Sequence, residues 1–139
     1  MTIVTVVETI AANANDDFKV LGDFGRIKVG GAITAFELEG EGVGAVRTIT
    51  MGGGQVIERL DEHDSEKLVF GYSILNEDNP LPVSNYSSQV EITANGEDAC
   101  TVNWSGTFEP KGADEAVASK VIHGIYTGGI ASTRKALGC

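Results

Sequence analysis

The sequence predicts an α+β fold in which a seven-stranded antiparallel sheet wraps around one long C-terminal helix. Two observations indicate this fold: strand-like runs are separated by short turn sequences, and the hydrophobic period becomes helical after residue 113. Strands joined by short turns pair antiparallel, and helices gathered on one face of such a sheet define the α+β class. With 139 residues, we expect one domain spanning residues 1–139.

The first elements are expected to be one strand and two short helices. Residues 2–10 are nearly all β-branched or apolar, which favours a strand. Asn13 can cap a short helix that runs to Leu21, because two acids follow in its first turn. Two glycines interrupt this helix, and we expect a second short helical turn around Arg26–Val29.

Six further strands are predicted between the short helices and the C-terminal helix. Glycine, asparagine, aspartate and proline cluster between these runs, as is typical of hairpin turns. The predicted strands are Ile33–Glu39, Ala45–Met51, Gln55–Asp61, Lys67–Leu75, Asn85–Thr93 and Cys100–Phe108.

One amphipathic helix is predicted from Asp114 to Leu137, with acids in its first turn and Gly138 able to end it. Its interior contains Gly124, Gly128 and Gly129, each of which costs about 1 kcal/mol relative to alanine in a helix. Such glycines indicate a close backbone approach, room for a ligand, or a bend in the helix.

The composition limits the classes of partner. Twenty acidic and ten basic residues give a formal net charge of −10, which argues against nucleic acid and anionic membranes as partners. The acidity fits simple solubility or recognition of a cationic partner. The two cysteines form no disulfide framework or metal motif, and no basic leader or long apolar segment is visible, so we expect a cytoplasmic protein without a membrane span.

Several short motifs follow one another along the chain in a recognisable order. They include Gly42-Val43-Gly44-Ala45-Val46-Arg47, Val56-Ile57-Glu58-Arg59-Leu60, Ser84-Asn85-Tyr86 and Trp104-Ser105-Gly106-Thr107-Phe108. In this order they resemble the bacterial polyketide cyclase/dehydrase branch of the START-like (SRPBCC) superfamily. The resemblance implies a helix-grip fold whose cavity binds one small hydrophobic molecule, polyketide-like, aromatic or terpenoid.

The motif order is also similar to that of plant abscisic-acid receptors. Those receptors carry a gate loop and a latch loop that correspond to Met51–Gln55 and Asn76–Val83 here. This chain has three glycines in the first loop and Leu81-Pro82-Val83 in the second, in place of the receptor sequences. Hormone reception is therefore not implied.

The candidate catalytic residues are Glu58, Tyr86 and His123. Strand alternation places Glu58 on an apolar face, and the resemblance directs it into the cavity, where it could transfer a proton or bind a ligand hydroxyl. A structural partnership with an arginine is the alternative. His123, in the long helix, is either a proton carrier or a structural residue.

The candidate ligand-binding residues are Arg47, Tyr72, Ser88, Trp104 and Tyr126. Arg47 would bind an anionic ligand group or form a structural pair with the candidate glutamate. The tyrosines would contact the ligand or be core aromatics with satisfied hydroxyls. Strand alternation places Trp104 on the inner face of the sheet. The resemblance to the receptors instead implies that Asn103 and Ser105 face the cavity.

No nucleophile, phosphate-loop or dinucleotide motif is visible, and His63 lacks the partners that a metal site needs, so we expect no cofactor and no metal. Three functions remain open. The chain could be a cyclase or dehydratase (a lyase-type enzyme), a lipid or metabolite carrier, or a ligand sensor that docks another protein. As an assembly, we expect a monomer or a homodimer.

Overall fold

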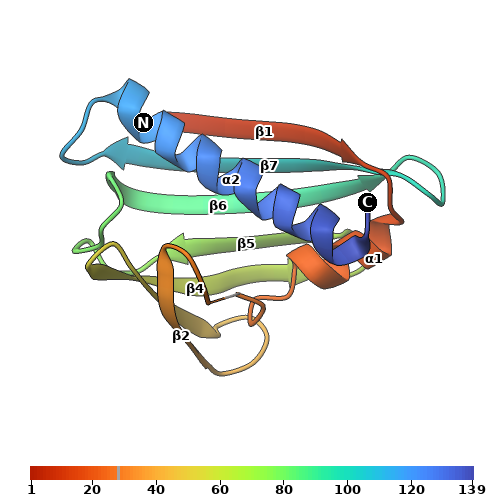
Figure 1. Ribbon diagram of the computed structural model, residues 1–139, viewed down its shortest axis with the longest axis horizontal. Coiled ribbons are helices and arrows are strands. Elements are labelled where there is room, and N and C mark those ends of the chain that lie inside the picture. The colour runs from red at the N-terminus through yellow and green to blue at the C-terminus, as the bar shows by residue number, and fades with distance from the viewer. Residues whose placement is uncertain (28) are drawn as a thin grey trace.

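In the computed structural model, which describes residues 1–27 and 29–139, antiparallel strands form one seven-stranded sheet in the order β1-β7-β6-β5-β4-β3-β2 (Figure 1). Strands β2 to β7 follow one another as a meander, and β1 pairs with β7 at the opposite edge. The strands are β1 (Thr2–Ile10), β2 (Ile33–Glu39), β3 (Val46–Met51), β4 (Gly54–Asp64), β5 (Val69–Ile74), β6 (Val83–Ala94) and β7 (Cys100–Pro110). The predicted sheet is confirmed.

The short helix after β1 and the long C-terminal helix are both present as predicted: α1 (Ala14–Leu21) and α2 (Glu115–Leu137). The Asn13 side chain accepts a hydrogen bond from the Asn15 amide at 2.9 Å, and Asp114 accepts one from the Val117 amide at 2.9 Å. These bonds satisfy backbone donors that the first helical turn leaves free. Gly138 ends α2 with a left-handed φ of 75°, as expected for a helix C-terminus.

The second short helix that the sequence predicted around Arg26–Val29 is not found among the described residues. Lys28 lies outside the described residues, and none of the other residues in that range is helical. The Asp23 carboxylate accepts a hydrogen bond from the Gly25 amide at 3.1 Å, which stabilises a turn instead of a helix. Downstream, Gly31 adopts a φ of 58°, and Gly30 bridges Ile33 to close a short hairpin that leads into β2.

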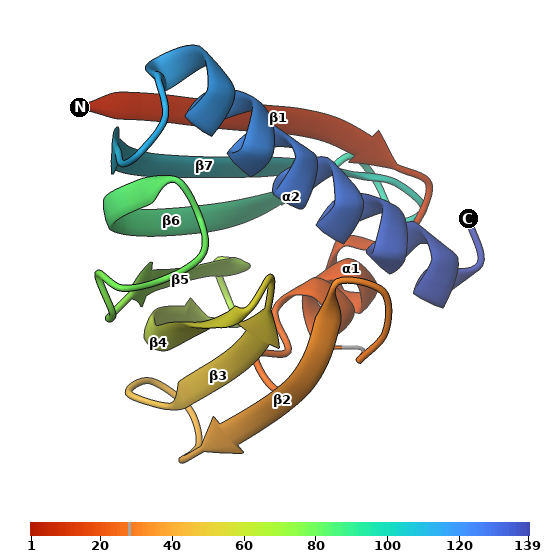
Figure 2. The same cartoon turned by 60° about the vertical axis from the view of Figure 1, so that its left-hand side comes forward.

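The core lies between the concave face of the sheet and α2. Alternate residues of β7 are buried, so Val102, Trp104 and Phe108 face inward, as strand alternation predicted, while Asn103 is exposed. Helix α2 packs against β1, β7 and α1. Figure 2 shows β2 and β3 at the edge of the sheet opposite β1, away from the strands against which α2 packs. No helix in the described part of the chain is long and apolar enough to span a membrane.

Candidate functional site

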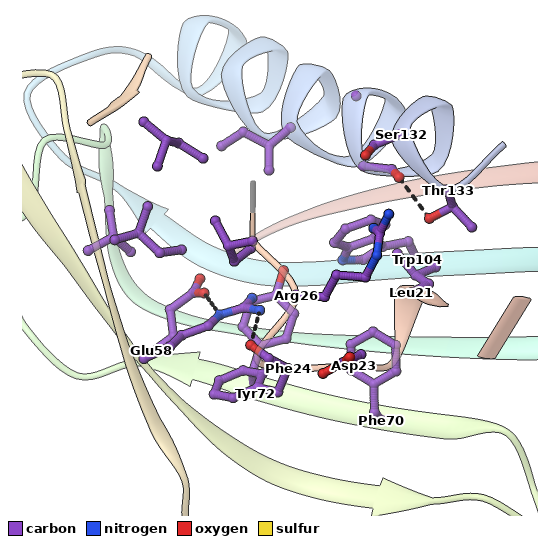
Figure 3. A pocket seen from close by; sticks show the side chains of 18 of the residues that line it. Leu21, Asp23, Phe24, Arg26, Glu58, Phe70, Tyr72, Trp104, Ser132 and Thr133 are labelled. Carbon is purple, nitrogen blue, oxygen red and sulfur yellow. Dashed lines mark hydrogen bonds and ion pairs between the residues drawn. The ribbon is translucent and has the colours of Figure 1, made fainter. Parts of the chain in front are cut away.

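A cavity of about 350 Å³ lies where the sheet curls away from α2. Its walls come from the loop after α1, from the inner faces of β3, β4 and β5, from Trp104 on β7, and from the C-terminal half of α2. The volume falls at the lower end of the roughly 300–1,000 Å³ typical of small-molecule sites. Most lining side chains are apolar or aromatic, and a small number of polar groups converge among them (Figure 3).

An ion pair between Arg47 and Glu58 is the main polar feature of the cavity wall. The two residues face each other on the paired strands β3 and β4, and Arg47 Nε lies 2.7 Å from Glu58 Oε1. Glu58 is only 7% exposed. Its second carboxylate oxygen has no hydrogen-bond donor among the described residues. One oxygen of a buried carboxylate is thus fixed, while the other has no protein partner among the described residues.

Aromatic side chains hold the guanidinium of Arg47 in place. Its carbon lies 4.1 Å from the centre of the Phe24 ring and 5.3 Å from that of Tyr72, and Nη1 donates to the Phe24 carbonyl at 3.2 Å. Cation–π contacts of this kind strengthen when they are shielded from water. The position of Glu58 is therefore fixed through Arg47, Phe24 and Tyr72 together.

A chain of hydrogen-bonded hydroxyls runs from the cavity into the core. The Tyr72 hydroxyl lies 3.4 Å from that of Tyr86, which lies 2.5 Å from that of Tyr126. The Tyr126 hydroxyl is 3.1 Å from Ser88 Oγ, which accepts from the Trp104 indole at 2.9 Å. Burial raises the pKa of each of the three tyrosines above its ordinary value of 10, so all three are neutral at physiological pH.

Two glycines make this packing possible. A Cβ at Gly106 on β7 would lie 1.9 Å from the Tyr126 hydroxyl, and a Cβ at Gly129 on α2 would lie 2.7 Å from the Trp104 ring. Trp104 and Tyr126 stack with ring centres 4.5 Å apart and an interplanar angle of 14°. The glycines therefore fix the depth at which the Trp104 ring enters the cavity wall.

The candidate residues separate into three groups. Four of them line the cavity: Glu58, Arg47, Tyr72 and Trp104. Three are buried behind the lining, in the hydroxyl chain: Tyr86, Ser88 and Tyr126. His123 is exposed and does not line the cavity. It lies about 200° around the helix from Ile125, which does line it, so the placement offers no route for His123 to reach a ligand.

Sequence reasoning missed several cavity residues. Phe24 and Arg26 lie in the loop after α1, where no periodicity indicates which way a side chain points. Ser132 lies seven residues after Ile125, a spacing that returns to the same helix face. This spacing could have identified Ser132 as a cavity residue. Among the described residues, no group of three or more histidine, cysteine, aspartate or glutamate side chains is arranged to hold a metal ion.

Comparison with known proteins connects this geometry to a family. A model of the family described as polyketide cyclase/dehydrase and lipid transport matches residues 1–138. The protein XoxI from Bacillus cereus is 29% identical, with a TM-score of 0.83, over 98% of this chain and 95% of that one. An uncharacterized protein from Bacillus thuringiensis is 28% identical, with a TM-score of 0.82, over 97% of this chain and 98% of that one.

A more distant structure shares the fold alone. Norcoclaurine synthase from Thalictrum flavum, solved in complex with dopamine and hydroxybenzaldehyde, is 20% identical with a TM-score of 0.77. The similarity covers 98% of this chain and 85% of the synthase. A search of curated protein sequences gave no match.

Proposed function

The chain belongs to the polyketide cyclase/dehydrase and lipid transport family, and on that premise we propose that it is a cofactor-free cyclase or dehydratase. Family membership confirms the resemblance inferred from the motifs, and with the fold it supports binding of a hydrophobic ligand. The proposed substrate is a polyketide-like, aromatic or terpenoid molecule held in the cavity. The observation that carries the proposal is the Glu58 carboxylate, buried at the cavity wall with one oxygen unbound.

Glu58 is suited to proton transfer by its fixed position. A general base must lie within hydrogen-bond reach of the proton that it removes, and a carboxylate anchored at one oxygen presents the other in a defined direction. Arg47, beside it, can stabilise negative charge that develops on a substrate carbonyl oxygen. Proton removal next to a carbonyl, followed by ring closure or loss of water, needs these two elements and a shaped apolar pocket.

The remaining candidates receive supporting roles in this proposal. Tyr72 reaches the cavity and is proposed as a hydrogen-bond donor to the substrate. Tyr86, Tyr126 and Ser88 hold the Tyr72 hydroxyl from behind, and are proposed as positioning residues. Trp104 is proposed as the apolar wall against which a ring of the substrate packs.

A second candidate function is a carrier that binds the same kind of molecule without altering it. The exposed apolar residues Val117, Val121 and Ile125 on α2 favour it. They lie on one helix face, and the last of them lines the cavity, so an exposed apolar strip of α2 ends at the cavity. Transfer of a hydrophobic ligand to or from another carrier would use such a strip.

Replacement of Glu58 by glutamine separates the two candidates. Native mass spectrometry of the purified protein would first identify a co-purified compound, whose conversion and binding are then measured. For an enzyme, Glu58→Gln should lower turnover by roughly 10²–10⁴-fold with affinity little changed, because the amide keeps the shape but cannot accept the proton.

Glu62→Gln is the matched control, because Glu62 is exposed on the same strand and bonds to Gln89. Equal turnover in the two variants would rule out proton transfer by Glu58. Binding without any conversion by the wild type would favour the carrier.

A further inference from the structure

The cavity contains an arginine that the proposed chemistry does not use. Arg26 follows α1 and lines the cavity, as does Ser132 of α2. Figure 3 shows the Arg26 side chain directed away from Glu58, toward the part of the cavity that α2 borders. The cavity therefore has two polar ends separated by apolar and aromatic side chains.

Arg26 is the cationic lining residue that has no anionic partner among the described residues. Arg47 and Glu58 pair with each other, and Asp23 turns a carboxylate oxygen back to the Gly25 amide. Within the described residues, Arg26 makes no ion pair and no side-chain hydrogen bond. A guanidinium beside an apolar cavity attracts an anionic group, and its planar fork of donors matches a carboxylate.

The negative charge of the whole protein makes Arg26 stand out as a binding site for anions. The formal net charge is −10, so anions are repelled from the surface in general and gain nothing from non-specific attraction. Glu58 at the other end of the cavity and Asp23, which also lines it, would likewise repel a carboxylate, so Arg26 is the cation that can offset them. These charges favour an orientation in which the anionic end of an acidic ligand lies at Arg26 and the other end points toward Glu58.

We propose that the cavity selects a carboxylic acid with an apolar, aromatic or polyketide-like body, whose carboxylate binds the Arg26 guanidinium with the Ser132 hydroxyl as a second donor. This inference rests on the proposed function, and it narrows the substrate class: the acid group is recognised at one end, and the reacting carbonyl or hydroxyl lies at the other. The acid group itself takes no part in the reaction.

The test uses a neutral reporter and a matched pair of competitors. N-phenyl-1-naphthylamine, which is uncharged and fluoresces in apolar surroundings, reports occupancy of the cavity. It is displaced by 2-naphthoate or by 2-naphthamide, which share a ring system and nearly the same shape and differ by one negative charge. For the wild type, 2-naphthoate should compete about tenfold better, the lower end of what a charge-assisted hydrogen bond gives, because Arg26 is exposed to water.

Two arginine variants locate the preference. Arg26→Gln should reduce the ratio of the two competitors to about one. Arg59→Gln removes the same charge from the outer face of β4, where Arg59 pairs with Asp61 at 2.8 Å, and should keep the full preference. Ser132→Ala should reduce the preference about threefold, the lower end of what one hydrogen bond contributes, because Ser132 is exposed to water.

Each result supports or overturns the inference. Equal competition by the acid and the amide in the wild type, or a preference that survives Arg26→Gln, would overturn the assignment of Arg26 while leaving the cavity intact. Failure of the neutral reporter to bind the wild type would overturn the proposed hydrophobic site and, with it, this inference. Circular dichroism of each variant establishes that it is folded.

Discussion

Replacing Gly106 with alanine tests whether the hydroxyl chain behind the cavity is packed as tightly as the structure indicates. The new Cβ would lie 1.9 Å from the Tyr126 hydroxyl oxygen and 3.2 Å from Cζ of the same ring. Tyr126 is fully buried and stacks on Trp104, so its ring has no free space into which to move. Relieving the clash therefore requires a shift of the helix, the strand or the stacked pair.

The cost follows from two contributions. Overpacking of a well-packed core costs about 1–3 kcal/mol. Displacing the Tyr126 hydroxyl also breaks its hydrogen bonds to Tyr86 and Ser88, at about 1 kcal/mol each. Gly106→Ala should thus lower the free energy of unfolding by about 3–5 kcal/mol, less a few tenths gained by restricting the unfolded chain.

A double-mutant cycle tests whether the loss of unfolding free energy comes from the clash with the Tyr126 hydroxyl oxygen. In the Tyr126→Phe background the clashing oxygen is absent, so the same alanine should cost about 1 kcal/mol or less. Urea unfolding followed by fluorescence measures all four proteins, since Trp104, the single tryptophan, stacks on residue 126. An alanine cost that is equal in the two backgrounds would refute the steric argument.

Three further predictions concern the helix, a buried acid and a loop. Gly129→Ala should weaken binding of N-phenyl-1-naphthylamine, because the new Cβ would push the Trp104 ring out of place. Gly124→Ala is the control: its Cβ would meet nothing within 4 Å, so binding should stay intact and the free energy of unfolding should rise by about 1 kcal/mol. Burial raises the pKa of Asp17 above 3.8, so its contribution to stability is complete below about pH 4 and is lost as the pH rises through the folded-state pKa. Asp17→Asn should therefore flatten the decline in unfolding free energy between pH 4 and pH 7, and an unchanged decline would contradict this origin. Amides of Met51–Gln55 should exchange hydrogen quickly in the free protein and more slowly with 2-naphthoate bound; strong protection in both states would show a rigid hairpin.

Features encoded by neighbouring residues could be predicted from the sequence. The predicted cap at Asn13 acts within two residues of itself, and the inward orientation of Glu58 follows from the two-residue period of a strand. Strand ends were predicted less well. For example, β6 begins at Val83, two residues before the prediction, because Val83 pairs with Pro110 at the end of β7. The partner strand, which lies far away in sequence, sets that boundary.

The border between cavity and core could not be predicted from periodicity. Tyr86 and Ser88 face inward as expected, yet they lie in the buried hydroxyl chain and do not line the cavity, whereas Tyr72 on the next strand does. The difference arises because α2 packs on the side of β1 and β7 and leaves the inner faces of β3 to β5 partly open (Figure 2). Strand alternation identifies the inner face, but the position of the helix over that face depends on packing of the whole chain.

The three interior glycines of α2 show that the same sequence signal occurs in three different surroundings. Each was expected to mark a close approach, space for a ligand, or a bend. Gly129 allows the close approach of Trp104, whose ring lies 2.7 Å from the position that a Cβ would take, while Gly128 lines the cavity and its Cβ would meet nothing within 4 Å. Gly124 has open space and does not line the cavity, so the structure gives no reason for it. Since the helical penalty of about 1 kcal/mol is the same at all three positions, only the surroundings of each Cβ distinguish a glycine that packing requires from one that alanine can replace.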